Sequence, residues 1–169
     1  RNVALGYQAQ LETTIGDSNI AIGYQAMGES GAFQNDKNIA IGSSYPTGNG
    51  DVLGAMGGDW ATAASTNNIA IGTGSMSGAM NGADKNVAVG VLSLQDLTEG
   101  VNNTAVGSSA GANIADGSNN VTLGFEAGAG IVAHLHNTYL GSKAGQSSTG
   151  TACVAVGYQA LKATHTQTG

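Results

Sequence analysis

Two histidines, His134 and His136, are the residues whose type and spacing best suit a metal site. Side chains alternate along a strand, so two residues separated by one position share a face. If several copies of the chain packed about one axis, their paired histidines could together bind one ion. His136, however, occupies a position held in other repeats by Ser18, Lys37 and Asn119, which predicts a solvated side chain. We therefore expect no metal and no cofactor, and keep the two histidines only as candidate ligands.

Acidic side chains could bind calcium or cleave glycosidic bonds if the fold brought them together. Asp17 and Asp36 would stack in successive repeats, but carboxylates in surface turns usually face water. The carboxylates considered for polysaccharide cleavage fall in different repeats: Asp59, Glu99, Asp116 and Glu126. The glycines, lysines and serines match no dinucleotide-binding or phosphate-binding motif. We predict that the chain is not an enzyme, with polysaccharide degradation as an alternative.

Aromatic residues gather in one irregular stretch, at about residues 43–67. It holds Tyr45, the only proline (Pro46) and the only tryptophan (Trp60). Irregular loops on a rigid scaffold often carry binding residues, and an exposed aromatic ring offers a flat face to a sugar. We predict Tyr45 and Trp60 as candidate receptor contacts. The alternative is that Trp60 packs over the side of the scaffold.

The scaffold that must position these residues is a repeat. A phrase such as Asn19-Ile20-Ala21-Ile22-Gly23 occurs nine times, mostly in steps of 17 residues. Self-similarity at a short fixed period indicates a repeat architecture. Its closing glycines are Gly6, Gly23, Gly42, Gly72, Gly90, Gly107, Gly124, Gly141 and Gly157. The opening Asn predicts a corner in the left-handed region of backbone space, and Cys153 replaces it in the last copy.

Each phrase predicts a short strand with two unlike faces. The branched residues on either side of the central position, such as Ile20 and Ile22, are expected to bury, while the small central residue would face another chain. A solvent-exposed column would instead hold polar residues. The predicted interface between chains is the alanine column: Ala4, Ala21, Ala40, Ala70, Ala88, Ala105 and Ala155.

A unit of about 17 residues has room for two short strands and two connections, but not for a helix. We therefore predict an all-β parallel β-solenoid of about nine coils, each pairing with the next about 4.8 Å away. Residues 1–169 would form one domain, expected to be a fragment of a longer chain, with the excursion at about 43–67 projecting from it. Because the core of such a coil is thin, we expect an obligate homo-oligomer.

Composition excludes several classes of protein. The chain has 169 residues, 28 glycines, one cysteine, five Lys and Arg together, and a net charge of -6. The acidic balance argues against nucleic acid as a partner, and a single cysteine excludes an internal disulfide framework. Apolar runs are too short for membrane insertion. Branched residues at fixed intervals argue against disorder.

The repeats resemble a known family. Asn-Val-Ala-Leu-Gly-Tyr-Gln-Ala at Asn2 to Ala9, and its copy at Asn19 to Ala26, are similar to the YadA-type head repeat of trimeric autotransporter adhesins. The similarity covers almost the whole chain. It implies a left-handed parallel β-roll, three chains side by side about a threefold axis, and attachment to a surface. The usual rule for parallel crossovers gives the opposite hand, so the handedness comes from the family alone.

A second resemblance shifts the expected origin. The steps here are longer than those of the adhesin heads, and Gly157 to Leu161 resembles repeats of bacteriophage tail-fibre proteins. We therefore expect an extracellular, structural and adhesive segment of a homotrimeric virion tail fibre. Its partner would be a polysaccharide or protein receptor on the host cell surface. The alternatives are a bacterial adhesin head on the outer cell surface and a polysaccharide-degrading fibre.

Overall fold

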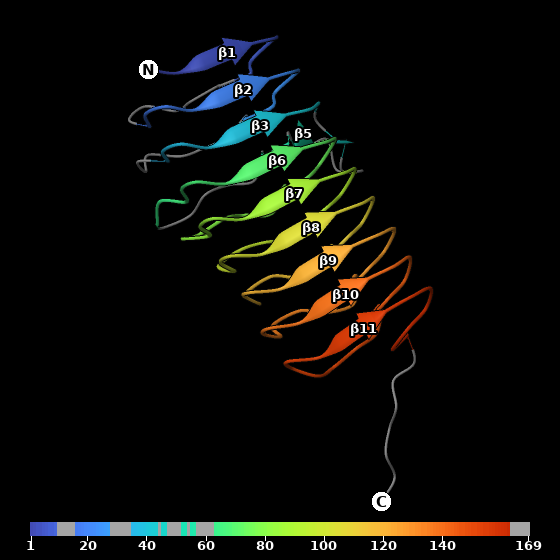
Figure 1. Cartoon of the computed structure of the whole chain (residues 1–169). Helices are drawn as coiled ribbons and strands as arrows, with labels where there is room; N and C mark the ends of the chain where they lie inside the picture. Colours follow the sequence, from blue (N-terminus) through green and yellow to red (C-terminus); the bar gives the residue numbers. More distant parts are fainter. Residues whose placement is uncertain are drawn as a thin grey trace, which may run out of the picture.

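The computed structural model describes residues 1–9, 16–27, 35–43, 45–46, 52–53, 55–56 and 63–162. These residues form an all-β solenoid in which one sheet of parallel strands runs the length of the molecule (Figure 1). The nine strands, in sheet order, are β1 (Val3–Leu5), β2 (Ile20–Ile22), β3 (Ile39–Ile41), β6 (Ile69–Ile71), β7 (Val87–Val89), β8 (Thr104–Val106), β9 (Val121–Leu123), β10 (Thr138–Leu140) and β11 (Val154–Val156). The described residues trace about seven turns of the solenoid, whereas about nine coils were predicted. The predicted parallel solenoid is confirmed.

The repeated phrase fixes the register of this sheet. Each strand pairs with its copy in the next coil, so that Ala88 lies beside Ala105, and Val89 beside Val106. The backbone ladder continues past the strand, since the amide of Gly107 donates to the Val89 carbonyl (2.8 Å) and that of Ser109 to the Val91 carbonyl (2.9 Å). Identical residues therefore stack in columns along the axis.

Each described coil contributes one three-residue strand to this sheet, and the rest of the coil consists of turns and bends. The predicted second strand is therefore wrong. The Tyr7-Gln8-Ala9 segment is a turn, with Gln8 at φ 50°. Residues in the left-handed region interrupt the extended backbone in each coil, so only the Asn-to-Gly phrase stays straight enough to form a strand.

The core contradicts the expected assignment of faces. The central residues of β2, β3, β6, β7 and β8 are alanines with no exposed area, whereas their branched neighbours are exposed or half-buried. The strands therefore point their alanines into the coil. The large side chains of the core come from the turns instead, and include Met27, Met56, Met76, Met80, Leu94, Leu97, Ile114 and Ile131.

A ladder of buried asparagines holds successive coils together. In the repeated phrase the opening Asn points inward, and the left-handed backbone belongs to the residue before it, such as Asn102 at φ 57°. The Asn103 side chain accepts a bond from the Asn120 backbone amide (3.0 Å) and donates to the Gly117 carbonyl (2.7 Å). A buried amide stabilises only when it is fully paired. The left-handed corner that was predicted at the opening Asn therefore lies one residue earlier in the chain.

The closing glycine of the phrase is required by close approach of the backbones. Gly107 has φ 133°, and a Cβ atom on it would lie 2.6 Å from the carbonyl oxygen of Gly124 in the next coil. No side chain can occupy that space without moving the backbone. The same geometry recurs at the other closing glycines that face a following coil. The glycine column is therefore a condition for the short distance between coils.

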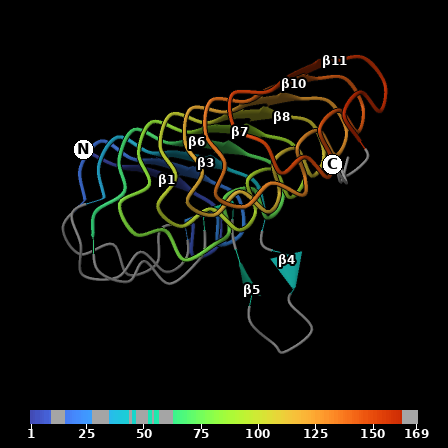
Figure 2. The same cartoon turned by 90° about the horizontal axis from the view of Figure 1, so that it is seen from below.

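The insertion leaves the solenoid as an antiparallel pair, β4 (Tyr45–Pro46) and β5 (Val52–Leu53). Figure 2 shows this pair projecting to one side of the coils. The chain is back in the body at Ala55 and Met56, because the Met56 amide donates to the Ala26 carbonyl (2.9 Å) and both residues are buried. The excursion is thus shorter than the predicted range of 43–67, and Ser65 and Thr66 already belong to the next coil.

Candidate functional site

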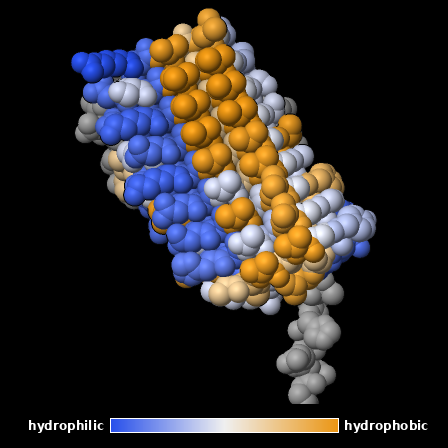
Figure 3. Space-filling view, viewed as in Figure 1, coloured by the Kyte–Doolittle hydropathy of each residue, from blue (hydrophilic) through white to orange (hydrophobic). Residues whose placement is uncertain are grey.

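The outer surface of the sheet is an apolar face that no other part of the described chain covers. It consists of the first and third residues of every strand in the nine-stranded sheet, and we call it the apolar stripe. Figure 3 shows it as two adjacent orange columns running the length of the solenoid. One column is Val3, Ile20, Ile39, Ile69, Val87, Thr104, Val121, Thr138 and Val154, and the other is Leu5, Ile22, Ile41, Ile71, Val89, Val106, Leu123, Leu140 and Val156.

The burial of these strands corrects the predicted interface. Ala21, Ala40, Ala70, Ala88, Ala105 and Ala155 lie inside their own chain, so their side chains cannot contact a neighbouring chain. Ala4 is exposed in β1, but it pairs with Ala21 in the same column. Ile71, one of the branched residues expected to face inward, is 37% exposed. The stripe is the surface that could contact a partner.

One signal in the sequence could have identified the outward face. The turn that follows each strand carries its own large apolar residues, such as Met76 and Leu94, and these are fully buried. A thin coil filled by such residues has room only for alanine on the inner side of the strand. The branched residues must then point outward. Alternation along a strand shows that two faces exist, but not which one is inside.

The exposed side of the stripe is uniform in chemistry. All eighteen positions are Val, Ile or Leu except Thr104 and Thr138. None carries a charge. Charged and amide side chains begin in the flanking column that precedes the buried asparagines, which includes Lys37, Lys85 and Asn102. Large apolar surfaces bounded by polar residues usually mark interaction sites.

Two deviations from the alanine column show how tightly the interior is filled. Thr122 and Tyr139 occupy the inward position in β9 and β10, and both are buried. Gly128 and Gly145 occupy the position that Leu94 has in an earlier coil, and the absence of their side chains leaves room for Tyr139. A Cβ atom on Gly145 would lie 2.6 Å from the tyrosine ring. Burial raises the pKa of Tyr139, and the nearby Ser148 hydroxyl lowers it in part, although the Tyr139 hydroxyl has no hydrogen bond of acceptable geometry.

The structure describes the two histidines within one chain. His136 has φ 61° and is exposed, in the same column as Ser18, Lys37 and Asn119. The backbone carbonyl of His134 accepts a bond from the Asn120 side chain (2.9 Å). Within the described residues, no group of three or more His, Cys, Asp or Glu side chains could hold a metal ion.

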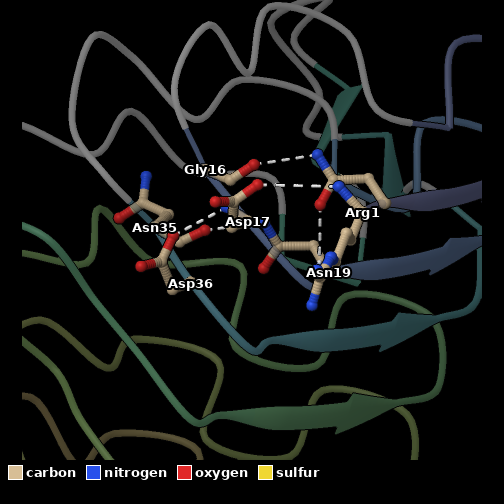
Figure 4. A network of polar contacts seen from close by, with 7 residues as sticks. Arg1, Gly16, Asp17, Asn19, Asn35 and Asp36 are labelled. Atoms are coloured by element: carbon tan, nitrogen blue, oxygen red, sulfur yellow. Dashed lines mark hydrogen bonds and ion pairs between the residues drawn. The ribbon is translucent and has the colours of Figure 1, made fainter.

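The carboxylates considered for calcium or catalysis have partners of other kinds. Asp36 accepts the backbone amide of Asp17 (2.7 Å), as Figure 4 shows beside the first asparagines of the ladder. Glu99 accepts the Asn81 amide (3.1 Å), and Asp116 accepts the Thr98 hydroxyl. Asp59 lies outside the described residues. Asp36, Glu99 and Asp116 thus accept hydrogen bonds from neighbouring coils.

A shallow polar groove of about 560 Å³ lies across three later coils. It is lined by Ser109, Ala112, Asn113, Glu126, Ala129, Gly130, Gln146 and Ser147. Glu126 is fixed there by the Gln146 amide (2.6 Å) and by Lys143, whose ammonium lies 3.5 Å from the carboxylate. With a single carboxylate, the groove has no acid and base pair of the kind that cleaves glycosides.

The aromatic receptor contacts predicted in the insertion stay predictions. Tyr45 lies in β4, but the structure does not describe its side chain, and Trp60 lies outside the described residues. The described coils carry a different aromatic pair, Tyr7 and Tyr24, whose stacked rings are 5.4 Å apart. They belong to the repeated Gly-Tyr-Gln-Ala segment, so the repeat itself could have indicated this stack.

No protein-family model, curated protein or solved structure matches this chain. In the part of the chain that the structure describes, no helix is both long and apolar enough to cross a membrane.

Proposed function

We propose that this chain is a structural and adhesive segment of a homotrimeric extracellular fibre, in which the apolar stripes of three copies pack together. The observation that carries the proposal is the stripe itself. Its side chains are uncharged and half-buried or exposed on all nine strands. With strands spaced about 4.8 Å apart, the stripe extends for about 40 Å. Leaving such a surface in water would favour aggregation, so a partner that covers it is favoured.

The period of the stripe favours a second copy of this chain as that partner. Its apolar side chains repeat at every coil along a straight axis, and a matching surface must be straight, apolar and of the same period. Another copy of the chain meets all three conditions because it carries the same stripe. The flanking amide and lysine side chains would form a polar rim along one side of the apolar centre.

Three copies, rather than two, and a left-handed roll follow from the resemblance to trimeric adhesin heads and tail fibres. The longer repeats and the Gly157 to Leu161 segment favour a bacteriophage tail fibre over a bacterial adhesin head. In either case the solenoid would act as a rigid spacer, and attachment to a host polysaccharide or protein would fall to parts that project from it. The insertion with Tyr45 and Trp60 is the proposed place for that contact.

A polysaccharide-degrading fibre is the second candidate in function. Among the described residues its support is the groove beside Glu126, but this groove has one carboxylate where glycoside cleavage uses a pair. The bonds that fix Glu126 to Lys143 and Gln146 favour a structural role instead. We therefore propose no chemistry for this chain. Release of reducing sugar from a host capsule would contradict this.

Analytical ultracentrifugation tests the proposal. The unmodified chain should sediment as a trimer at micromolar concentration. The double variant Val121→Asp with Leu123→Asp should dissociate to monomers, since six carboxylates would meet in an apolar centre. A matched control, Ser109→Asp with Asn113→Asp, adds the same charge in the groove and should leave the trimer intact. A folded monomer of the unmodified chain at this concentration would refute the proposal.

A further inference from the structure

The regularity of the apolar stripe creates a problem of alignment. Val87, Ile69 and their neighbours in the same column are nearly equivalent, so a copy displaced by one coil would keep most of its apolar contacts. Register is weakly specified wherever a surface is uniform. Something other than apolar packing must therefore set how far one copy lies along another.

Two positions break the uniformity. Thr104 and Thr138 are the only polar residues of the stripe, they share one column, and both are exposed. Figure 3 shows two pale interruptions in one orange column. Neither hydroxyl forms a hydrogen bond with another described residue. Threonine has almost the shape of valine, so the difference from the rest of the column is the hydroxyl alone.

We propose that Thr104 and Thr138 set the axial register of the assembled copies, with each threonine meeting its own counterparts around the axis. This inference rests on the proposed assembly through the stripe. When the copies are level, the hydroxyls at each of the two heights can bond to one another, as threonine pairs do across strands. A single polar residue in an apolar seam fixes register in coiled coils by the same means.

The spacing of the two threonines makes the level arrangement unique. After a slip of one coil, Thr104 faces Val87 or Val121, and Thr138 faces Val121 or Val154. Every hydroxyl is then buried against an apolar side chain without a partner, which is costly. After a slip of two coils, Thr104 of one copy meets Thr138 of the next, but the remaining hydroxyls stay unpaired. Only the level register pairs all of them.

Disulfide trapping tests the register directly, in a Cys153→Ser background. Thr138→Cys should cross-link copies to one another upon oxidation, because disulfides form only when the Cα atoms lie within about 7 Å. The register is read from two further variants. A disulfide between two Val87→Cys chains forms when the copies are level. In a mixture of differently tagged Val87→Cys and Ile69→Cys chains, a disulfide between the two kinds of chain forms when one copy has slipped by one coil. With both threonines present, level cross-links should dominate and mixed ones should be rare.

Removing both hydroxyls should release the register but keep the assembly. In chains that also carry Thr104→Val and Thr138→Val, mixed cross-links should rise by about tenfold relative to level ones, while the sedimenting mass stays the same. Thr104→Ser with Thr138→Ser keeps the hydroxyls and should retain the level pattern. Mixed cross-links that stay rare in the valine variant, or absence of the Thr138→Cys cross-link in an intact trimer, would overturn the inference. Monomeric chains would instead overturn the proposed assembly.

Discussion

The two faces of the same three-residue strands obey different rules. On the inner face, size decides: alanine fills the column from β2 to β8, and every such alanine is completely buried. On the outer face, Val, Ile and Leu replace one another along the stripe, and apolar character is kept at every position except Thr104 and Thr138. The inner face is therefore specified by the space within one chain, whereas the outer face is specified by a chemical property that a partner would use.

The size of the residue that fits on the inner face depends on the side chains of the neighbouring coils. Tyr139 stands in the alanine column because glycines at 128 and 145 vacate the space that Leu94 fills in an earlier coil. The volume of the interior is thus conserved although its residues change. Packing to constant density explains this exchange better than a preference for alanine.

The largest loss of stability should come from truncating Tyr139, the one large side chain on the inner face of the strands. Tyr139→Ala leaves a cavity beside two glycines, so the free energy of unfolding should fall by about 3–5 kcal/mol in urea titration. Tyr139→Phe is the control. It should be neutral or slightly stabilising, because the buried hydroxyl has no hydrogen bond to lose. A loss of stability in the phenylalanine variant similar to that in the alanine variant would contradict the packing account.

A smaller effect should separate the two faces within one strand. Ala88→Leu adds three carbons to a filled interior and should destabilise the fold by about 1–3 kcal/mol. Val89→Leu, its neighbour on the outer face, adds one carbon outside the filled interior of the chain, so it should destabilise the fold by less than Ala88→Leu does. Thermal unfolding of both variants makes the comparison. Equal effects would mean that the faces do not differ as described.

The smallest effect concerns a turn residue that belongs to neither face of the strand. Partial burial raises the pKa of Asp96 above its ordinary value. The folded state then binds the proton more tightly than the unfolded state. Protonated Asp96 therefore adds to the free energy of unfolding, fully below about pH 3.9, and this addition is lost as the pH rises through the raised pKa. Asp96→Asn should gain stability relative to the unmodified chain between pH 3 and pH 6, by a small amount because Asp96 is largely exposed. A constant difference across this range would refute the assignment.

The repeat in the sequence was enough to predict the strands and their register. It placed Val87 beside Thr104 and Ile20 beside Ile39, because the same phrase must stack on itself. It did not tell which face is inside, since alternation is symmetric between the two. That choice depends on turn residues such as Leu94 and Met76, whose inward direction comes from left-handed backbone at those positions. The alanine column predicted to face another chain therefore lies on the side of the strands that faces the interior.

The asparagine ladder has a consequence for how the molecule forms. The side chain of Asn103 meets the backbone of the coil that follows, and the side chain of Asn86 has already done the same for Asn103. A coil without its predecessor lacks the template for these bonds. Folding should therefore advance one coil at a time along the axis, because each folded coil supplies the hydrogen-bond partners of the next.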